Sequence, residues 1–390
     1  MKVGISCYPS HGGSGVVATE LGMELAKRGH EVHFVSYAIP FRLKPYSERI
    51  FFHEVTNASY PLFQFPLYTM TLAAKLAEVA DEVGLDVIHA HYAIPHAVCA
   101  YLAREVALSR DRLRVVTTLH GTDITLVGSD QSFRAITRFG IERSDGVTAV
   151  SDFLRRRTVD VFAPRREVEV IPNFVDTARY VPRGDGGPCR SRYARDGEKV
   201  LTHISNFRAS KRAPDAVRVL AAVRRETPAV LLMVGDGPER TRSREVAVEL
   251  GVDRHVRYLG QMDAVEDVLA ASDLFVLPSE NESFGLAALE AMSSGVPVIG
   301  TTAEGLPELI RFGETGYLVP VGDVEGMARR AIEVLTDTKL QARMGAAARQ
   351  TAVERYEASR VIPLYEKFYE KVLERPAFLP PPLAPPEGVA

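Results

Sequence analysis

The stretch LFVLPSENESFGLAALEAMSSGVPVIG, residues 274–300, contains one complete strand–helix–strand unit. Residues 274–277 form a short apolar run that ends at Pro278, and residues 296–300 form a second run after Gly295. Between the two runs, apolar residues recur at helical spacing from about Ser283 onward. Such a unit is typical of a parallel sheet that is covered by helices. We therefore predict a strand at each end of the stretch and a helix that begins near Ser283.

The same alternation continues through the rest of the chain. In the first half, strands are expected at 2–7, 31–36, 87–91, 115–120 and 146–150, with a helix at 16–28. A second series is expected at 168–171, 200–204, 229–234, 256–259, 274–277 and 296–300. The predicted fold class is α/β, with two facing Rossmann-like doubly wound domains. Open parallel sheets bind ligands at the carboxyl ends of their strands, so the cleft between the two domains is the expected site.

Proline and glycine mark the expected domain boundary. The segment 170–188 is rich in both residues, which indicates a hinge. We place the first domain at 1–170 and the second at 171–358. A terminal helix predicted at 359–374 is expected to complete the first domain, and the proline-rich tail at 376–390 is expected to be disordered.

The bulk composition excludes several classes of partner. A formal net charge of -3 over 390 residues provides no basic field for nucleic acid or anionic lipid. Cys7, Cys99 and Cys189 share no metal-binding or redox spacing, which indicates reduced thiols. No apolar run approaches the roughly 18 residues of a membrane span. We expect a cytoplasmic protein without nucleic-acid or membrane partners.

A glycine-rich turn follows the first expected strand. Gly12, Gly13 and Gly15 would let backbone N–H groups approach an anionic or sugar ligand at the start of the next helix. A tight strand-to-helix connection would use the same pattern. A dinucleotide site is disfavoured, because Glu31 precedes the second strand instead of ending it.

The most informative candidate site is the start of the helix within 274–300. We expect Ser283 to cap this helix, so that the N–H groups of Phe284, Gly285 and Leu286 point into the cleft. A diphosphate would bind at such a helix start.

Two glutamates flank this helix start. Glu282 and Glu290 are eight positions apart, which corresponds to about 12 Å along a helix axis. Paired-carboxylate hydrolases need about 5 to 9.5 Å between their groups, so the spacing argues against that chemistry. It suits the two ends of one sugar nucleotide, with Glu282 at the sugar and Glu290 at the ribose.

Basic residues follow another expected strand. Lys211, with Arg208 and Arg212 beside it, could neutralise a leaving diphosphate, although basic residues in such loops are more often simply solvated. The turn that contains Gly235 and Asp236 is suited to nucleotide contact.

Histidines gather near two expected strand ends. His89, His91, His96 and His120 do not form a convincing metal site, because no carboxylate or cysteine completes a ligand set. We expect strand-end polar residues to orient a sugar and an acceptor instead. The candidates are Tyr92, His120, Thr122 and Arg138.

These motifs resemble those of the retaining GT-B glycosyltransferases of family 4, over nearly the whole chain up to about residue 374. The family's paired-glutamate element corresponds to Glu282 and Glu290 within ESFGLAALE. The segments CYPSHGGSGVVATELG, HAHYAIPHA, TLHGTDITLVG, RFGIERSDGVTAVS, IPNFVD, SNFRASKR and GTTAEGLPELI are similar to those of the branch that glycosylates L-malate in bacillithiol biosynthesis.

The resemblance implies a donor, an acceptor and a mechanism. The donor would be UDP-N-acetylglucosamine and the acceptor the hydroxyl of L-malate, with retention of the anomeric configuration, no metal and no other cofactor. The implied catalytic residues are Glu282, His120 and Lys211. The implied donor-binding residues are Gly13, Asn206, Arg208, Lys211, Gly235, Asp236, Glu282, Ser283, Phe284, Gly285, Leu286 and Glu290. The implied acceptor-binding residues are Ser14, Tyr92, Thr122 and Arg138.

One position departs from the broad family pattern, and several functions stay open. Asn206 stands where many members carry an arginine, so Arg208 or Arg212 would have to supply the missing charge. An inositol phosphate or a glycan as acceptor, a UDP-N-acetylglucosamine 2-epimerase and a non-enzymatic sugar-nucleotide binding protein are the alternatives. A homodimer is a further expectation.

Overall fold

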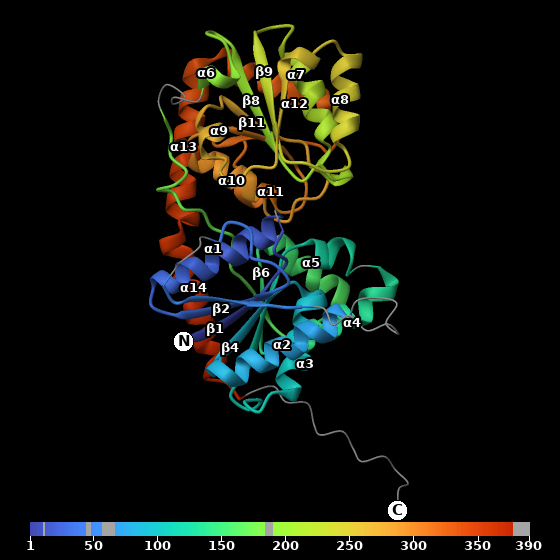
Figure 1. Cartoon of the computed structure of the whole chain (residues 1–390). Coiled ribbons are helices and arrows are strands. Elements are labelled where there is room, and N and C mark those ends of the chain that lie inside the picture. The colour runs from blue at the N-terminus through green and yellow to red at the C-terminus, as the bar shows by residue number, and fades with distance from the viewer. Residues whose placement is uncertain (11, 44–47, 57–66, 129, 184–189, 377–390) are drawn as a thin grey trace, which may run out of the picture.

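The protein consists of two α/β lobes, each built around a parallel sheet with helices on both faces (Figure 1). The computed structural model describes residues 1–10, 12–43, 48–56, 67–128, 130–183 and 190–376. The predicted tail therefore lies, from residue 377 onward, outside the described residues, as do residues 184–188 of the predicted hinge and Cys189. The predicted fold class, two facing doubly wound units, is confirmed.

The first lobe contains a seven-stranded sheet in the order β3-β2-β1-β4-β5-β6-β7. Its strands are β1 (Lys2–Ser6), β2 (Glu31–Ser36), β3 (Ile50–Glu54), β4 (Val87–His91), β5 (Arg114–Leu119), β6 (Gly146–Ala149) and β7 (Val168–Val170). Its helices are α1 (Gly13–Lys27), α2 (Tyr68–Val83), α3 (Val98–Val106), α4 (Gln131–Arg143) and α5 (Asp152–Phe162), with short helical turns at Ala93–Ala97 and Thr122–Leu126.

The second lobe contains a six-stranded sheet in the order β10-β9-β8-β11-β12-β13. Its strands are β8 (Lys199–Ile204), β9 (Ala229–Val234), β10 (Val256–Gly260), β11 (Leu274–Leu277), β12 (Val298–Thr301) and β13 (Gly316–Val319). Its helices are α6 (Arg190–Tyr193), α7 (Ala213–Val223), α8 (Arg240–Glu249), α9 (Glu266–Ala270), α10 (Leu286–Ser293), α11 (Leu306–Leu309), α12 (Val324–Thr336) and α13 (Thr338–Tyr356), with single turns at Ala209–Lys211 and Asp253–His255. The last helix of the chain is α14 (Ala358–Leu373).

The buried strands explain why the sheets are parallel. All six residues of β9, AVLLMV, are buried, which is the pattern of a strand covered on both faces. One prediction was wrong here, because the strand expected to open the second series, β7, pairs with β6 and closes the first sheet. Sequence order alone does not say which sheet a strand joins.

The terminal helix α14 returns to the first lobe, as Figure 1 shows. Its apolar side chains, among them Val361, Tyr365 and Phe368, pack in one core with Val3 and Ile5 of β1. This burial explains why the last helix of the chain belongs with the first strand.

The two chain crossings between the lobes lie side by side. The Val175 N–H donates to the Tyr356 carbonyl at 2.9 Å, and the Ala358 N–H donates to the Val175 carbonyl at 3.1 Å. Apolar side chains of both lobes, such as Leu119 and Phe284, also belong to one buried cluster. Among the helices of the described chain, none combines the length and the apolar character needed to cross a bilayer.

Candidate active site between the lobes

Two adjoining cavities lie between the carboxyl ends of the two sheets. We call them the large cavity, of about 830 Å³, and the small cavity, of about 180 Å³. The volume of the large cavity is typical of a small-molecule site. The residues that line both cavities are Gly12, Gly13, Asn206, Lys211, Glu282, Gly285 and Leu286. A ligand that passes these residues would occupy both cavities.

The structure brings nearly all predicted site residues to these cavities. The predicted residues along the small cavity are Gly13, Asn206, Lys211, Gly235, Asp236, Glu282, Gly285, Leu286 and Glu290. Those along the large cavity are Gly13, Ser14, Tyr92, His120, Thr122, Asn206, Arg208, Lys211, Glu282, Ser283, Phe284, Gly285 and Leu286. Arg138 is the exception, because it is exposed on α4 and lines neither cavity.

The glycines of the first turn have different roles. A Cβ atom at Gly15 would lie 2.6 Å from the Tyr8 carbonyl oxygen and 2.7 Å from that of Ser10, so the tight strand-to-helix connection needs glycine there. At Gly13, no atom lies within 4 Å of such a Cβ atom, and the residue opens α1 beside both cavities. Gly13 is therefore the position where a ligand can approach the helix start.

The helix within residues 274–300 begins at Leu286, two residues later than the predicted first-turn residue Phe284. The helix α10 starts at Leu286 with Gly285 as its N-cap residue, so the prediction that Ser283 caps it was wrong. Gly285 has φ of 94°, so the chain changes direction at this residue and Ser283 does not lie on the helix axis. Ser283 instead lies against Gly121 of the first lobe, where a Cβ atom would be 1.6 Å from Ser283 Oγ. The helix start still faces the ligand space, because Gly285, Leu286 and Ala287 line the small cavity.

Lys211 and Glu282, predicted from separate motifs, form an ion pair at the junction of the cavities. Lys211 Nζ donates to Glu282 Oε2 at 2.7 Å and to the Asn281 carbonyl at 3.1 Å. Both side chains keep about a fifth of their surface exposed, so they remain open to a ligand. A positive charge is thus fixed where the two cavities meet.

The loop within the motif GTTAEGLPELI, to which the sequence prediction gave no role, supports Glu282. The Gly305 N–H donates to the Glu282 carbonyl at 3.0 Å, and Asn281 Nδ2 donates to Glu304 Oε1 at 3.3 Å. Glu304 has φ of 47°, a left-handed conformation that is uncommon outside glycine. Burial raises the pKa of Glu304 above its ordinary value.

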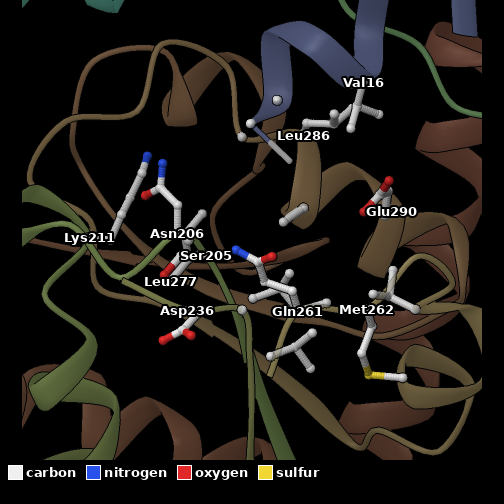
Figure 2. Close-up of a pocket in the computed structure, with 18 of the residues that line it drawn as sticks. Val16, Ser205, Asn206, Lys211, Asp236, Gln261, Met262, Leu277, Leu286 and Glu290 are labelled. Atoms are coloured by element: carbon white, nitrogen blue, oxygen red, sulfur yellow. The ribbon is translucent and has the colours of Figure 1, made fainter. Parts of the chain in front are cut away.

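Figure 2 shows the small cavity with Lys211 and Asn206 on one side and Glu290 on the other. Glu290 is buried, and its Oε1 accepts from Arg42 Nη1 at 3.0 Å and from the Tyr180 hydroxyl at 2.9 Å. The Lys211 ammonium and the buried Glu290 carboxylate therefore lie at separate ends of the small cavity.

Gln261 and Met262 also line the small cavity and were not predicted (Figure 2). They follow β10, so their position at a strand end is the signal that could have found them. Gly235 lies nearby with φ of 113°, and a Cβ atom there would lie 1.8 Å from the Ser205 carbonyl oxygen. Only glycine lets these two loops approach so closely.

The first-lobe wall of the large cavity carries a group of polar side chains among apolar residues. Ser14 Oγ donates to the Tyr92 hydroxyl at 3.1 Å, and Thr122 and His120 lie on the same wall. Tyr92 has φ of 103°, a strained conformation of the kind that often occurs at functional sites. Burial raises the pKa of Tyr92. The positive charge of Arg208, across the cleft, acts to lower this pKa.

Of the four histidines near these strand ends, His89, His91 and His96 are fully buried and His120 is half-buried, and burial lowers the pKa of all four, so that they are neutral. His91 Nδ1 and His120 Nε2 share a hydrogen bond of 2.9 Å, and burial lowers the pKa of His120 to about 3. His89 contacts the Tyr369 hydroxyl at 2.7 Å, which connects the first sheet to α14. Within the part of the chain that the structure describes, no three His, Cys, Asp or Glu side chains are arranged to hold a metal ion.

Asp123, which the sequence prediction also missed, fixes the His120 segment. Its buried carboxylate accepts from the backbone N–H groups of Ala93 and Gly121, both at 2.9 Å, and of His120 at 3.2 Å. Burial raises the pKa of Asp123 to about 6. The carboxylate therefore holds two strand ends of the first lobe in register.

Of the two arginines beside Lys211, one faces the ligand space. Arg208 lines the large cavity, whereas Arg212 Nε donates to Asp215 Oδ2 at 2.6 Å and lines neither cavity. Arg208 is thus the arginine that can act on a ligand.

A carboxylate of the second lobe caps a helix of the first. Glu308 accepts from the backbone N–H groups of Asp152 at 2.9 Å and Phe153 at 2.6 Å, and Ser151 Oγ accepts from Leu154 N–H at 3.2 Å. The first three N–H groups of α5 are therefore satisfied, two of them across the lobe boundary. This contact helps to fix the lobes relative to each other.

Two family models match the chain one after the other. The model described as Glycosyltransferase Family 4 matches residues 11–179, and that described as Glycosyl transferases group 1 matches residues 190–351. Each covers one of the two lobes.

Individual relatives match over most of their length. The N-acetyl-alpha-D-glucosaminyl L-malate synthase of Bacillus anthracis is 48% identical over 374 residues, which cover 96% of this chain and 97% of that protein. The GDP-mannose-dependent alpha-(1-6)-phosphatidylinositol monomannoside mannosyltransferase of Mycolicibacterium smegmatis is 29% identical over 298 residues, which cover 74% of this chain and 77% of that protein.

The fold also matches solved structures. Anabaena HepE in complex with UDP and glucose superposes with a TM-score of 0.82 at 22% identity, covering 95% of this chain and 99% of that one. This similarity concerns the fold of both lobes and their arrangement.

Proposed function

Because this chain belongs to the GT-B glycosyltransferases, we propose that it transfers N-acetylglucosamine from UDP-N-acetylglucosamine to the hydroxyl of L-malate. The products would be UDP and N-acetylglucosaminyl-α-L-malate, the first intermediate of bacillithiol biosynthesis. The observation that carries the proposal is the meeting of Lys211 and Glu282 of the second lobe with Gly13 and His120 of the first around one ligand space. The name of the relative at 48% identity supports the choice of substrates.

We propose one orientation for the donor in the two cavities. Its diphosphate lies at the junction, where Lys211 and the starts of α1 and α10 offer positive charge and N–H groups. Its uridine extends into the small cavity, with the ribose toward Glu290 and the base toward Gln261. Its sugar then enters the large cavity beside Glu282.

The proposed reaction proceeds on one face of the sugar. The malate hydroxyl oxygen forms a bond to the anomeric carbon as the bond from that carbon to the β-phosphate oxygen breaks. The hydroxyl proton passes to the departing phosphate oxygen, so no covalent sugar intermediate forms. Lys211 stabilises the negative charge that develops on the leaving UDP. His120 faces the sugar as a neutral hydrogen-bonding group, since burial lowers the pKa of its imidazole to about 3.

A dianionic acceptor needs positive charge and hydrogen-bond donors. In the described lining of the large cavity, Arg208 and Lys211 supply charge, and the hydroxyls of Ser14, Tyr92 and Thr122 face them from the first lobe. We propose that malate lies between these groups. The family resemblance also suggests Arg138, whose helix α4 contributes Phe133 and Ile136 to the same cavity.

The test is an assay of UDP release. The purified protein is incubated with UDP-N-acetylglucosamine, with and without L-malate, in the presence of a chelator. Malate-dependent release of UDP supports the proposal, and its persistence in chelator supports metal independence. Release that needs inositol phosphate or a glycan acceptor instead of malate contradicts the proposed acceptor. Epimerisation of the donor without UDP release contradicts glycosyl transfer.

Three further expectations belong to the same proposal. We propose that the anomeric configuration is retained, which nuclear magnetic resonance of the product would measure from the coupling of its anomeric proton. We propose a cytoplasmic enzyme, because its substrates are cytoplasmic metabolites. A homodimer is also proposed, and sedimentation of the full chain tests it.

A further inference from the structure

Arg42 of the first lobe reaches into the second lobe and holds its buried glutamate. Arg42 follows β2 and has φ of 69°, an uncommon conformation for a bulky residue. Only 8% of its side chain is exposed. Its Nη1 donates to Glu20 Oε1 of α1 at 2.8 Å and to Glu290 Oε1 of α10 at 3.0 Å.

The surroundings of Arg42 keep its guanidinium charged. Burial disfavours the charge, but the carboxylates of Glu290 and Glu20 outweigh this effect and raise the pKa of Arg42 above its ordinary value. Arg179 Nη1 donates to the same Glu20 oxygen at 3.5 Å, so Glu20 has a second cationic partner. Glu290 has no second cation among the described residues, and it depends on Arg42 for charge neutralisation.

The contacts of Glu290 are concentrated on one of its two oxygens. Arg42 and the Tyr180 hydroxyl both donate to Oε1, whereas Oε2 accepts no hydrogen bond from any described residue. Glu290 lines the small cavity at the end away from Lys211, as Figure 2 shows. A carboxylate held by one oxygen presents the other in a fixed direction.

We propose that Arg42 is a positioning residue for donor binding, which fixes the Glu290 carboxylate through Oε1 so that Oε2 accepts a hydrogen bond from the ribose hydroxyls of a uridine nucleotide. This inference rests on the proposed function, since it assumes that the ribose lies at Glu290. It goes beyond that function by giving a first-lobe residue, Arg42, a role at the ribose end of the donor site, through Glu290. The donor site is thus complete only when the two lobes are close enough for Arg42 to reach Glu290.

The proposal predicts a dependence on the ribose hydroxyls themselves. Arg42 lines the small cavity, but the proposal gives it an effect on the nucleotide through Glu290, so removing Arg42 should weaken binding of UDP but not of 2′,3′-dideoxy-UDP. A direct effect of the arginine charge on the phosphates would weaken binding of both nucleotides equally. The two nucleotides carry the same diphosphate, which makes this comparison selective.

The experiment measures the Kd values of UDP and 2′,3′-dideoxy-UDP by isothermal titration calorimetry for the full chain. The variants are Arg42→Gln and, as a smaller change at the same Glu290 oxygen, Tyr180→Phe. Arg179→Gln is the matched control. Arg179 belongs to the same cluster, with ion pairs to Glu20 and Glu266 and its guanidinium over the Tyr180 ring, but in the described part of the chain it forms no hydrogen bond or ion pair with Glu290. Thermal denaturation of each variant shows whether it is folded.

For Arg42→Gln we expect the Kd of UDP to rise about tenfold or more and that of the dideoxy nucleotide by less than about twofold. Tyr180→Phe should show the same selectivity with a smaller rise in the Kd of UDP. If Arg42→Gln does not fold, the result for Tyr180→Phe decides the test. Arg179→Gln should leave the ratio of the two Kd values unchanged. An equal rise for both nucleotides, or no rise for either, overturns the role of Arg42 while the donor assignment stands. Failure of the unmodified protein to bind UDP overturns the proposed donor, and the role of Arg42 with it.

Discussion

Replacing Lys211 by methionine tests whether the junction of the cavities holds the diphosphate. Lys211 Nζ lies 2.7 Å from Glu282 Oε2 and 3.1 Å from the Asn281 carbonyl, so its position is fixed before a ligand arrives. A hydrogen bond to a charged group contributes about 1.5 to 3 kcal/mol. At about 1.4 kcal/mol per factor of ten, kcat/KM for UDP-N-acetylglucosamine should fall about 10- to 150-fold.

A second effect of Lys211→Met acts in the same direction. Glu282 loses its cation, and among the described residues its carboxylate keeps the Ser279 hydroxyl, whose Oγ donates to Glu282 Oε2 at 3.4 Å. An unpaired carboxylate beside a diphosphate repels it, so the decrease should lie toward the upper part of the range.

The assay measures initial rates of UDP release at saturating L-malate over a range of donor concentrations. Lys199→Met is the matched control, because Lys199 lies at the opposite end of β8, where its Nζ donates to Gln341 Oε1 at 3.2 Å. The kcat/KM of this control variant should stay within about twofold of that of the unmodified enzyme. A folded Lys211→Met variant whose kcat/KM stays within about threefold would refute the assignment of the diphosphate to this junction.

Three further predictions concern the lobes and the buried histidines. Gly121→Ala should lower kcat/KM by about 100-fold, because a Cβ atom there would lie 2.6 Å from Ser283 Cβ, which rotation of the serine hydroxyl does not relieve, and because Gly121 has φ of 120°; unchanged kinetics would contradict this. Glu308→Ala should lower the free energy of unfolding by about 1–2 kcal/mol in urea titrations, since two N–H groups of α5 lose their acceptor, and an unchanged midpoint would argue against the cap. Burial lowers the pKa values of His89 and His96 from 6.5 to about 3, so the unfolded chain binds protons that the folded chain does not, and stability should decrease as the pH falls below 6.5. At pH 5 the loss is about 2 kcal/mol for each histidine, and His96→Gln should make the decrease between pH 7 and pH 5 shallower than in the unmodified protein.

The sequence predicts a strand most clearly where consecutive residues are all apolar. The runs of β9 and β11 are apolar throughout, because helices cover both faces of the sheet. The strand β3, IFFHE, was missed, since it is an edge strand with exposed and half-buried residues and no clear alternation. The strand β13, GYLV, was also missed. It is as short as β11, but it opens with a glycine, so its apolar run has only three residues.

Some site residues could likewise be predicted from local motifs, whereas the contacts between them could not. Motifs at strand ends predicted Lys211 and Glu282, because the fold brings the carboxyl ends of parallel strands to one edge. Their direct ion pair required the structure. Arg42 and Glu290 are 248 positions apart, and no local pattern relates them. Ser283 was given the wrong role because a serine before a helical pattern normally caps it, whereas contact with the other lobe decides its position here.

The most direct test of the account is a crystal structure of the protein with UDP and L-malate. We predict the diphosphate within hydrogen-bonding distance of Lys211 Nζ and beside the starts of α1 and α10, the ribose at Glu290, and malate in the large cavity near Tyr92. A nucleotide bound away from Lys211 and the start of α10 would contradict the central claim.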